Sequence, residues 1–256
     1  MSRLEDALRR RVTGGGRAFV PYVTGGFPGV DPDLLHRIQD AGADAIEVGI
    51  PFSDPVMDGG VIQEASRVAL EKGTRPGDVL AMIGDAALSI PVAVMTYVNP
   101  VFRIGFERFL DDAVTHGVDG VIVPDLPVDE SDEWTALCDV RGVAAVQLAA
   151  PGSSPERLQR IAQGARGFVY CVATYGVTGA RSELGNPARE VVAGLRPLTP
   201  LPLLVGVGIS TPEQAAEACT FADGVIVGTA MMSPIVAGDP AGAVALAEAF
   251  REQIPR

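Results

Sequence analysis

The chain has 256 residues, of which 47% are hydrophobic and 20% charged, which is enough to bury the core of one large α/β domain spanning residues 1–256. Its formal net charge of −12 at pH 7 repels nucleic acid and anionic membrane surfaces, and no basic stripe opposes that field. No apolar run is long enough to span a membrane, so we expect a cytoplasmic protein that binds neither nucleic acid nor membrane.

Short apolar runs alternate with amphipathic stretches along the chain. The runs predicted to be strands are 18–23, 45–50, 92–97, 120–124, 144–148, 167–172, 203–206 and 224–227. The predicted helices include 33–41, 106–116, 131–140, 155–163, 187–195 and 212–219, with a doubled helix, 61–71 and 76–88, after the second strand. Strands that alternate with helices form parallel sheets with right-handed crossovers.

Eight such units in this length predict a closed (β/α)8 TIM barrel, with an extra N-terminal helix at about residues 4–11. A doubly wound open sheet is the alternative. It is disfavoured because no G-x-G-x-x-G motif follows the first strand.

The second predicted strand carries an unexpected carboxylate. Glu47 lies in the apolar run 45–50, and the following loop, stiffened by Pro51 and Pro55, holds Asp54 and Asp58. Glu47 could form an ion pair inside the core or be solvated at the strand end. Because burying a carboxylate without a partner is costly, we favour a functional acid/base pair.

Polar residues and glycines collect where the predicted strands end, which is where barrels of this type hold their active sites. These positions are Tyr22 to Thr24, Glu47, Tyr97 with Asn99, Asp125, Tyr170, the segment 206–208, and Gly228 with Thr229. The sequence therefore predicts that the functional side chains gather on one rim.

Glycine-bearing segments after the last strands indicate a phosphate site. The segment 206–208 leads from the seventh strand toward a helix, and residues 228–230 lead from the eighth strand into a short turn. Backbone amides and a helix N-terminus at this position bind anions in such barrels. A further segment, 176–179, could form a lid. The alternative is that all of these glycines only make tight turns.

The remaining residue types limit the chemistry. His36 and His116 lie in helical patterns, and the only lysine, Lys72, closes a helix, so metal, Schiff-base and Ser-His-Asp mechanisms are not expected. Cys138, Cys171 and Cys219 lack a C-x-x-C spacing and are interpreted as buried small side chains. Carboxylates, tyrosines and backbone amides remain, which favours proton transfer on a phosphorylated small molecule.

Several motifs in order along the chain resemble those of the tryptophan synthase alpha subunit family. They are the segment 47–55 (EVGIPFSDP) with Asp58 and Gly59, 61–63 (VIQ), 95–100 (MTYVNP), 124–127 (PDLP), 176–179 (GVTG), 208–210 (GIS) and 222–228 (ADGVIVG). The resemblance covers essentially the whole chain. It implies a (β/α)8 barrel that cleaves indole-3-glycerol phosphate to indole and glyceraldehyde 3-phosphate.

The resemblance also implies roles for individual residues. Glu47 would be the general acid/base, and Asp58 would hold the indole N–H. The remaining implied contacts are a tyrosine beside the glutamate at Tyr170, a lid threonine at Thr178, phosphate-binding groups at Gly179, Gly208, Gly228 and Thr229, and an indole pocket at Tyr22 and Val207. No cofactor or metal is implied, because the pyridoxal phosphate belongs to the beta subunit, the expected partner in an alpha-beta-beta-alpha heterotetramer.

Some positions depart from the family pattern. They are Gly60 in place of a common proline, Tyr22 and Val207 in place of phenylalanines, Thr229 in place of a serine, and 173–175 (ATY) where Ser-Arg is more usual. The catalytic carboxylates are retained. A stand-alone lyase that releases indole, and a barrel acting mainly as an allosteric activator of beta, are the alternatives. The loops around Phe52 and Phe102 favour a partner docked on the rim.

Overall fold

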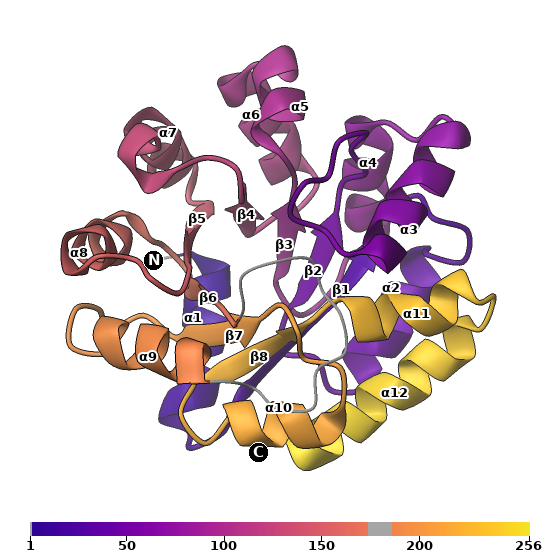
Figure 1. The fold of residues 1–256 in the computed structure, drawn as a ribbon. Helices are drawn as coiled ribbons and strands as arrows, with labels where there is room; N and C mark the ends of the chain where they lie inside the picture. Colours follow the sequence, from indigo (N-terminus) through magenta and orange to yellow (C-terminus); the bar gives the residue numbers. More distant parts are fainter. Residues whose placement is uncertain (1, 174–185) are drawn as a thin grey trace.

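The computed structural model describes residues 2–173 and 186–256, and it shows a closed barrel of parallel strands ringed by helices (Figure 1). The strands are β1 (Ala18–Thr24), β2 (Ile46–Gly49), β3 (Val92–Met95), β4 (Gly120–Ile122), β5 (Ala144–Ala149), β6 (Val169–Val172), β7 (Leu203–Gly206) and β8 (Gly224–Val227). Each strand pairs with its neighbours in sequence, and β1 pairs with β8 to close the ring. The predicted barrel is confirmed.

Helices connect the strands and cover the outside of the barrel. They are α1 (Arg3–Thr13), α2 (Pro32–Asp40), α3 (Gly60–Glu71), α4 (Pro76–Ala86), α5 (Val98–Ile104), α6 (Phe106–Thr115), the 3₁₀ turn η1 (Val128–Glu130), α7 (Asp132–Arg141), α8 (Pro155–Gly164), α9 (Asn186–Leu195), α10 (Pro212–Ala218), α11 (Thr229–Val236) and α12 (Pro240–Gln253). Side-chain caps define several starts. Asp31, Ser154 and Thr211 each accept a backbone N–H of the first turn, with proline next in sequence.

The structure corrects the sequence prediction in three places. The short turn expected after β8 is wrong, because α11 begins at Thr229. The third strand ends at Met95 rather than at residue 97, and α5 follows it almost at once. The C-terminal helix α12 was not predicted. Among the described residues, no helix is long and apolar enough to cross a membrane.

Strand alternation separates an inner from an outer layer of side chains. Ile46 and Val48 of β2 pack outward with the helices, whereas Ala45 belongs to the cluster inside the barrel. Leu4 and Leu8 of α1 join that inner cluster and are fully buried. The extra N-terminal helix therefore closes one end of the barrel, and the other end has no such helix among the described residues.

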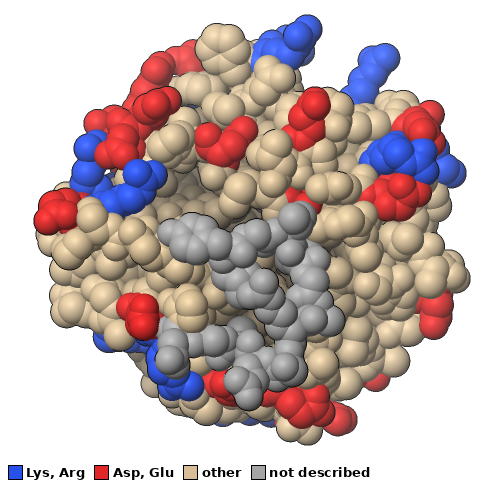
Figure 2. All heavy atoms as spheres, viewed as in Figure 1, with Lys and Arg blue, Asp and Glu red and all other residues tan. Residues whose placement is uncertain are grey.

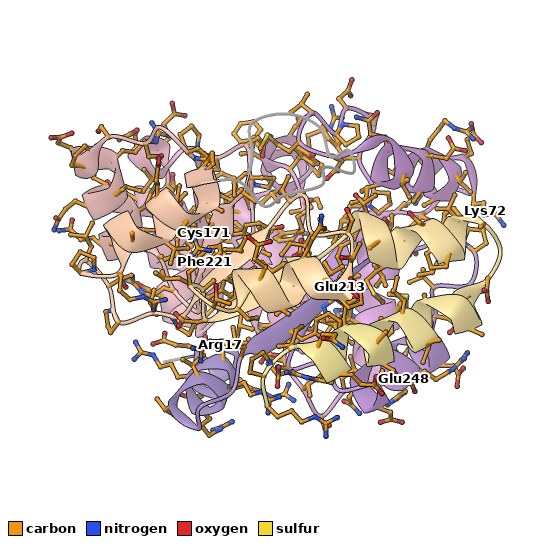
Figure 3. All side chains as sticks on the ribbon, turned by 60° about the horizontal axis from the view of Figure 1, so that its bottom comes forward. Arg17, Lys72, Cys171, Glu213, Phe221 and Glu248 are labelled. Carbon is orange, nitrogen blue, oxygen red and sulfur yellow. The ribbon has the colours of Figure 1, made fainter. Side chains whose placement is uncertain are left out.

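The closed end is held by aspartates placed just before three even-numbered strands. Each accepts a hydrogen bond from the backbone N–H of the residue opposite on the preceding strand: Phe19 to Asp44 (2.9 Å), Val92 to Asp119 (3.0 Å) and Leu203 to Asp223 (2.8 Å). Each also pairs with an arginine: Arg251 with Asp44, Arg3 with Asp119 and Arg196 with Asp223. In Figure 3 this end lies at the bottom, where α1 and the labelled Arg17 are found.

Candidate active site

A cavity opens at the carboxyl ends of the strands, opposite α1. The volume of this cavity is about 840 Å³, which includes solvent space at its mouth. Figure 2 looks onto this end of the barrel, and charged side chains stand mainly around its margin. The described lining residues are Tyr22, Glu47, Met57, Asp58, Gly59, Ile62, Met95, Ile122, Pro124, Leu148, Tyr170, Val172, Val207, Gly208, Ile209, Ser210, Ile226, Gly228 and Thr229. The cavity is thus apolar, with two carboxylates and two phenols.

Glu47 points into this cavity because of the alternation along β2. It shares the inward face with Ala45, and its side chain is only 3% exposed. Among the described residues, no group hydrogen-bonds to its Oε2 atom. Burial, followed by the nearby charge of Asp58, raises the pKa of Glu47 to about 8. This carboxyl group therefore keeps its proton at neutral pH.

Asp58 reaches the same cavity from the loop after β2. The loop turns back on itself where Asp58 N–H donates to Pro55 O (3.1 Å), and Gln63 Nε2 of α3 donates to Asp58 O (2.8 Å). The side chain of Asp58 is 8% exposed. Burial raises the pKa of Asp58 to about 6, while a hydrogen bond with Tyr97 opposes that rise. At neutral pH the two carboxyls therefore differ in charge, Asp58 ionised and Glu47 protonated.

The two cavity tyrosines lie over glycines in a repeated arrangement. A Cβ on Gly49 would come within 2.1 Å of the Tyr22 hydroxyl, and one on Gly206 within 2.3 Å of the Tyr170 hydroxyl. In both cases the glycine stands two residues beyond the tyrosine's partner on the neighbouring strand. Only glycine leaves room for these phenols. Burial is the main cause that raises the pKa of both phenols, so both stay neutral.

The turn after β7 brings a strained valine to the cavity wall. Val207 has φ of +64° and Gly208 has φ of +102°. A β-branched residue in the left-handed region costs on the order of 1–3 kcal/mol, and such strain is found mainly at functional sites. The turn exposes both residues to the cavity.

Next to this turn, after the neighbouring strand β8, the wall is the beginning of α11. Gly228 is the N-cap and Thr229 the first helical residue, and both line the cavity. The N-terminus of a helix carries partial positive charge and backbone donors, which suit an anion. None of the described lining residues is lysine or arginine. An anion bound here would therefore be held by the backbone and the helix rather than by a cationic side chain.

Most of the predicted site residues meet in this cavity. Tyr22, Glu47, Asp58, Tyr170, Val207, Gly208, Gly228 and Thr229 all line it. Thr178 and Gly179, with the predicted lid 176–179, lie outside the described residues. Asn99 and Asp125 do not line it; instead Asp125 Oδ1 accepts the N–H of Val98 (2.8 Å) at the start of α5.

Sequence reasoning missed the apolar wall of the cavity. Ile62, Met95 and Ile226 line it, yet in the sequence they look like ordinary core residues. The inward parity of Met95 and Ile226 on their strands could have identified them. The sequence analysis placed Tyr97 on the rim but assigned it no role.

Comparison with known proteins gives a consistent result. A family model described as tryptophan synthase alpha chain matches residues 9–253. The tryptophan synthase alpha chain of Synechocystis sp. is 43% identical over 258 residues, which cover 97% of this chain and 95% of that relative. The alpha chain of Streptomyces avermitilis is 44% identical over 90% of this chain and 84% of its own length.

Solved structures agree with the sequence relatives. The structure of Mycobacterium tuberculosis tryptophan synthase in space group F222 superimposes with a TM-score of 0.91 at 35% identity, covering 100% of this chain and 99% of the other. The crystal structure of the tryptophan synthase alpha chain from Legionella pneumophila gives a TM-score of 0.87 at 34% identity, with coverages of 99% and 97%.

Proposed function

The chain belongs to the tryptophan synthase alpha chain family, and from that premise we propose that Glu47 and Asp58 divide the acid/base and electrostatic work of its reaction. The alpha subunit is a lyase of tryptophan biosynthesis, and it cleaves indole-3-glycerol phosphate into indole and glyceraldehyde 3-phosphate. The observation that carries the proposal is the buried Glu47 carboxyl, whose Oε2 has no hydrogen-bond partner among the described residues and which faces the same cavity as Asp58.

Glu47 is the acid and then the base of the cleavage. Its carboxyl group, protonated at neutral pH, delivers a proton to C3 of the indole ring. The resulting carboxylate takes the proton of the hydroxyl on the adjacent glycerol carbon. The carbon–carbon bond then breaks, its electron pair restores the aromatic ring, and the oxygen becomes the aldehyde of glyceraldehyde 3-phosphate. Glu47 ends the cycle protonated, so no external acid is consumed.

Asp58 stabilises the charge that develops between these two proton transfers. Protonation at C3 makes the ring nitrogen positive, and an ionised Asp58 accepts its N–H hydrogen bond. Because Asp58 is buried, its fixed carboxylate stabilises positive charge more strongly than it would in bulk solvent. Tyr22, Tyr170 and Val207 form the walls around the ring.

The phosphate is held at the start of α11 and in the turn after β7. Gly208, Gly228 and Thr229 present backbone donors at this wall, away from the carboxylates of β2 and its loop. The net charge of −12 gives no general attraction for an anion, so this local site has to supply it. No cofactor is required by the steps proposed here, and activity should survive dialysis against EDTA.

The partner is the beta subunit of tryptophan synthase, docked on the open rim as part of an alpha-beta-beta-alpha heterotetramer. Val56, in the loop after β2, and Phe102, on α5, are each 74% exposed, and Met57, which lines the cavity, is 45% exposed. Exposed apolar side chains grouped on one rim are typical of a protein contact. We also propose a cytoplasmic location, in keeping with three cysteines that are all free.

Indole release from indole-3-glycerol phosphate, measured with and without a beta subunit, tests this proposal. We expect slow cleavage alone and saturable activation by beta, because a partner that prefers the competent state shifts the population toward it. Phe102→Ala should weaken the activation, while Val140→Ala, which removes a valine that is 84% exposed on α7, is the matched control and should not. A flat titration with full activity alone would favour the stand-alone lyase. Absence of cleavage under both conditions would overturn the proposal.

A further inference from the structure

Tyr97 lies beside the cavity without lining it, and it contacts the loop that carries Asp58. The residue is the N-cap of α5 and is only 2% exposed. Its hydroxyl oxygen accepts the backbone N–H of Met57 at 3.1 Å, and its ring stacks on Phe52 with centroids 5.1 Å apart. Both contacts are to the segment between β2 and Asp58, so Tyr97 touches the loop near each of its ends.

The backbone on both sides of Tyr97 is fixed to the barrel. Thr96 N–H donates to Ile122 O of β4 (3.0 Å), and Val98 N–H donates to Asp125 Oδ1 (2.8 Å). The Asp58 loop has fewer ties, and Ser53 and Asp54 within it are exposed. Tyr97 is therefore fixed to the barrel, and the less constrained Asp58 loop packs against it.

The hydrogen-bond inventory of a phenol then sets the direction of its proton. A tyrosine hydroxyl has a single hydrogen and accepts through its oxygen. Because the oxygen accepts Met57 N–H, the hydrogen is free to be donated to the carboxylate of Asp58, the next residue along the loop. Burial and the charge of Asp58 both raise the pKa of Tyr97, so the phenol remains a donor over the working pH range.

We propose that Tyr97 is a positioning residue for the cleavage reaction: it holds the Asp58 loop in place and donates its hydroxyl proton to Asp58, which favours the ionised carboxylate. This inference rests on the proposed function, in which the ionised form of Asp58 accepts the indole N–H. A donor directed at a carboxylate stabilises the charged form over the neutral one. Without this donor, the buried Asp58 carboxyl would stay protonated up to a higher pH, and in that range it would not stabilise the positive ring.

The experiment compares Tyr97→Phe with Phe52→Leu and the wild type. The first variant keeps the ring and its stacking but removes the hydroxyl, whereas the second removes the stacking and keeps the hydroxyl. For Tyr97→Phe we expect kcat/KM to fall about fivefold at pH 6 and hardly at all at pH 8, because the acid limb moves upward by about one pH unit. For Phe52→Leu we expect a higher KM with the acid limb unchanged.

A second readout does not depend on activity. The Asp58 carboxyl carbon, labelled with carbon-13 and assigned by its absence in Asp58→Asn, should titrate at a higher pH in Tyr97→Phe than in the wild type. A loss of activity that is the same at every pH, with an unchanged Asp58 titration, would overturn the inference and leave Tyr97 a structural residue. If the wild type fails to cleave the substrate, the proposed function fails, while the carboxyl titration still tests the link between Tyr97 and Asp58.

Discussion

The two ends of the barrel treat buried carboxylates in opposite ways, and β2 shows both within four residues. Asp44, just before the strand at the closed end, accepts the N–H of Phe19 and pairs with Arg251 and Arg11. Glu47, inside the strand near the open end, is more deeply buried but has an oxygen without a hydrogen-bond partner among the described residues. Burial raises the pKa of both, but at Asp44 three partners oppose the rise.

This difference shows where the fold is stabilised and where it is kept reactive. At the closed end, aspartates tie neighbouring strands and distant arginines together. At the open end, among the described residues, a hydrogen bond from Tyr97 to Asp58 opposes the rise in pKa that desolvation causes, whereas Glu47 Oε2 has no hydrogen-bond partner. An acid that is paired on all sides is a poor proton carrier, so an Oε2 atom without a hydrogen-bond partner among the described residues suits the acid/base role proposed for Glu47. Substitutions at the two ends should therefore differ in their effects on stability and on activity.

Glu47→Gln should cause the largest loss of activity, but it should make the protein more stable at pH 8. The amide cannot exchange a proton, so we expect kcat/KM to fall about 10³-fold or more. The pKa of Glu47 is raised from 4.5 to about 8, so the wild type loses stability as the pH rises through that range, and the variant does not. We would measure the free energy of unfolding of both proteins at pH 5 and at pH 8. Between these two pH values the variant should gain about 3 kcal/mol of stability relative to the wild type. Turnover within about tenfold of wild type would exclude Glu47 as the acid/base.

Asp44→Asn should do the reverse. It leaves the guanidinium of Arg251, whose side chain is 5% exposed, with backbone carbonyls but without its half-buried carboxylate partner, and we expect a loss of about 3 kcal/mol in the free energy of unfolding. The activity of the folded variant should stay within about threefold of wild type, because the site lies at the other end of the barrel. Asp129→Asn is the control. That side chain is 44% exposed in its pairs with Arg157 and Arg160, so its loss should be about 0–1 kcal/mol.

The pH dependence of kcat/KM should be bell-shaped. Below about 6 Asp58 takes up a proton and no longer stabilises the positive ring, and above about 8 Glu47 loses the proton that it must donate. Each limb should change the rate about tenfold per pH unit. Asp44→Asn should leave both limbs where they are. A profile that is flat from pH 5 to 9 in the wild type would contradict the assignment of roles.

Val207→Gly should give the smallest effect, and Ala87→Gly is its matched control at the other end. In the described part of the chain these are the two non-glycine residues with positive φ, +64° at Val207 and +46° at Ala87. Relief of the left-handed strain should stabilise each variant by about 1 kcal/mol. Only Val207 lines the cavity, so only its variant should show a raised KM. An equal change in KM for both would mean that the effect is not local to the site.

Much of this architecture follows from the sequence, because it depends on local patterns. Apolar runs that alternate with helical stretches predict a parallel sheet, and eight such units in a chain of this length favour the closed barrel that the structure shows. Glu47 and Asp58 stood out because a carboxylate in an apolar run is costly. The turn predicted at residues 228–230 was wrong. A glycine followed by two small residues resembles a turn, but α11 begins there because tertiary packing stabilises it, and that packing is not visible in the local sequence.

Only the tertiary structure could decide which distant groups meet. Tyr97 lies 40 residues from Met57, and Arg251 lies 207 residues from Asp44, so neither contact has a sequence period that would indicate it. The same holds for Gly49 and Gly206, whose missing side chains matter because tyrosines from neighbouring strands lie over them. The order of residues along the chain sets which carboxylates, tyrosines and glycines stand at the strand ends. The closing of the barrel determined their partners, and through those partners which carboxylates are stabilised and which remain free to exchange a proton, because hydrogen bonding and desolvation depend on neighbours in space.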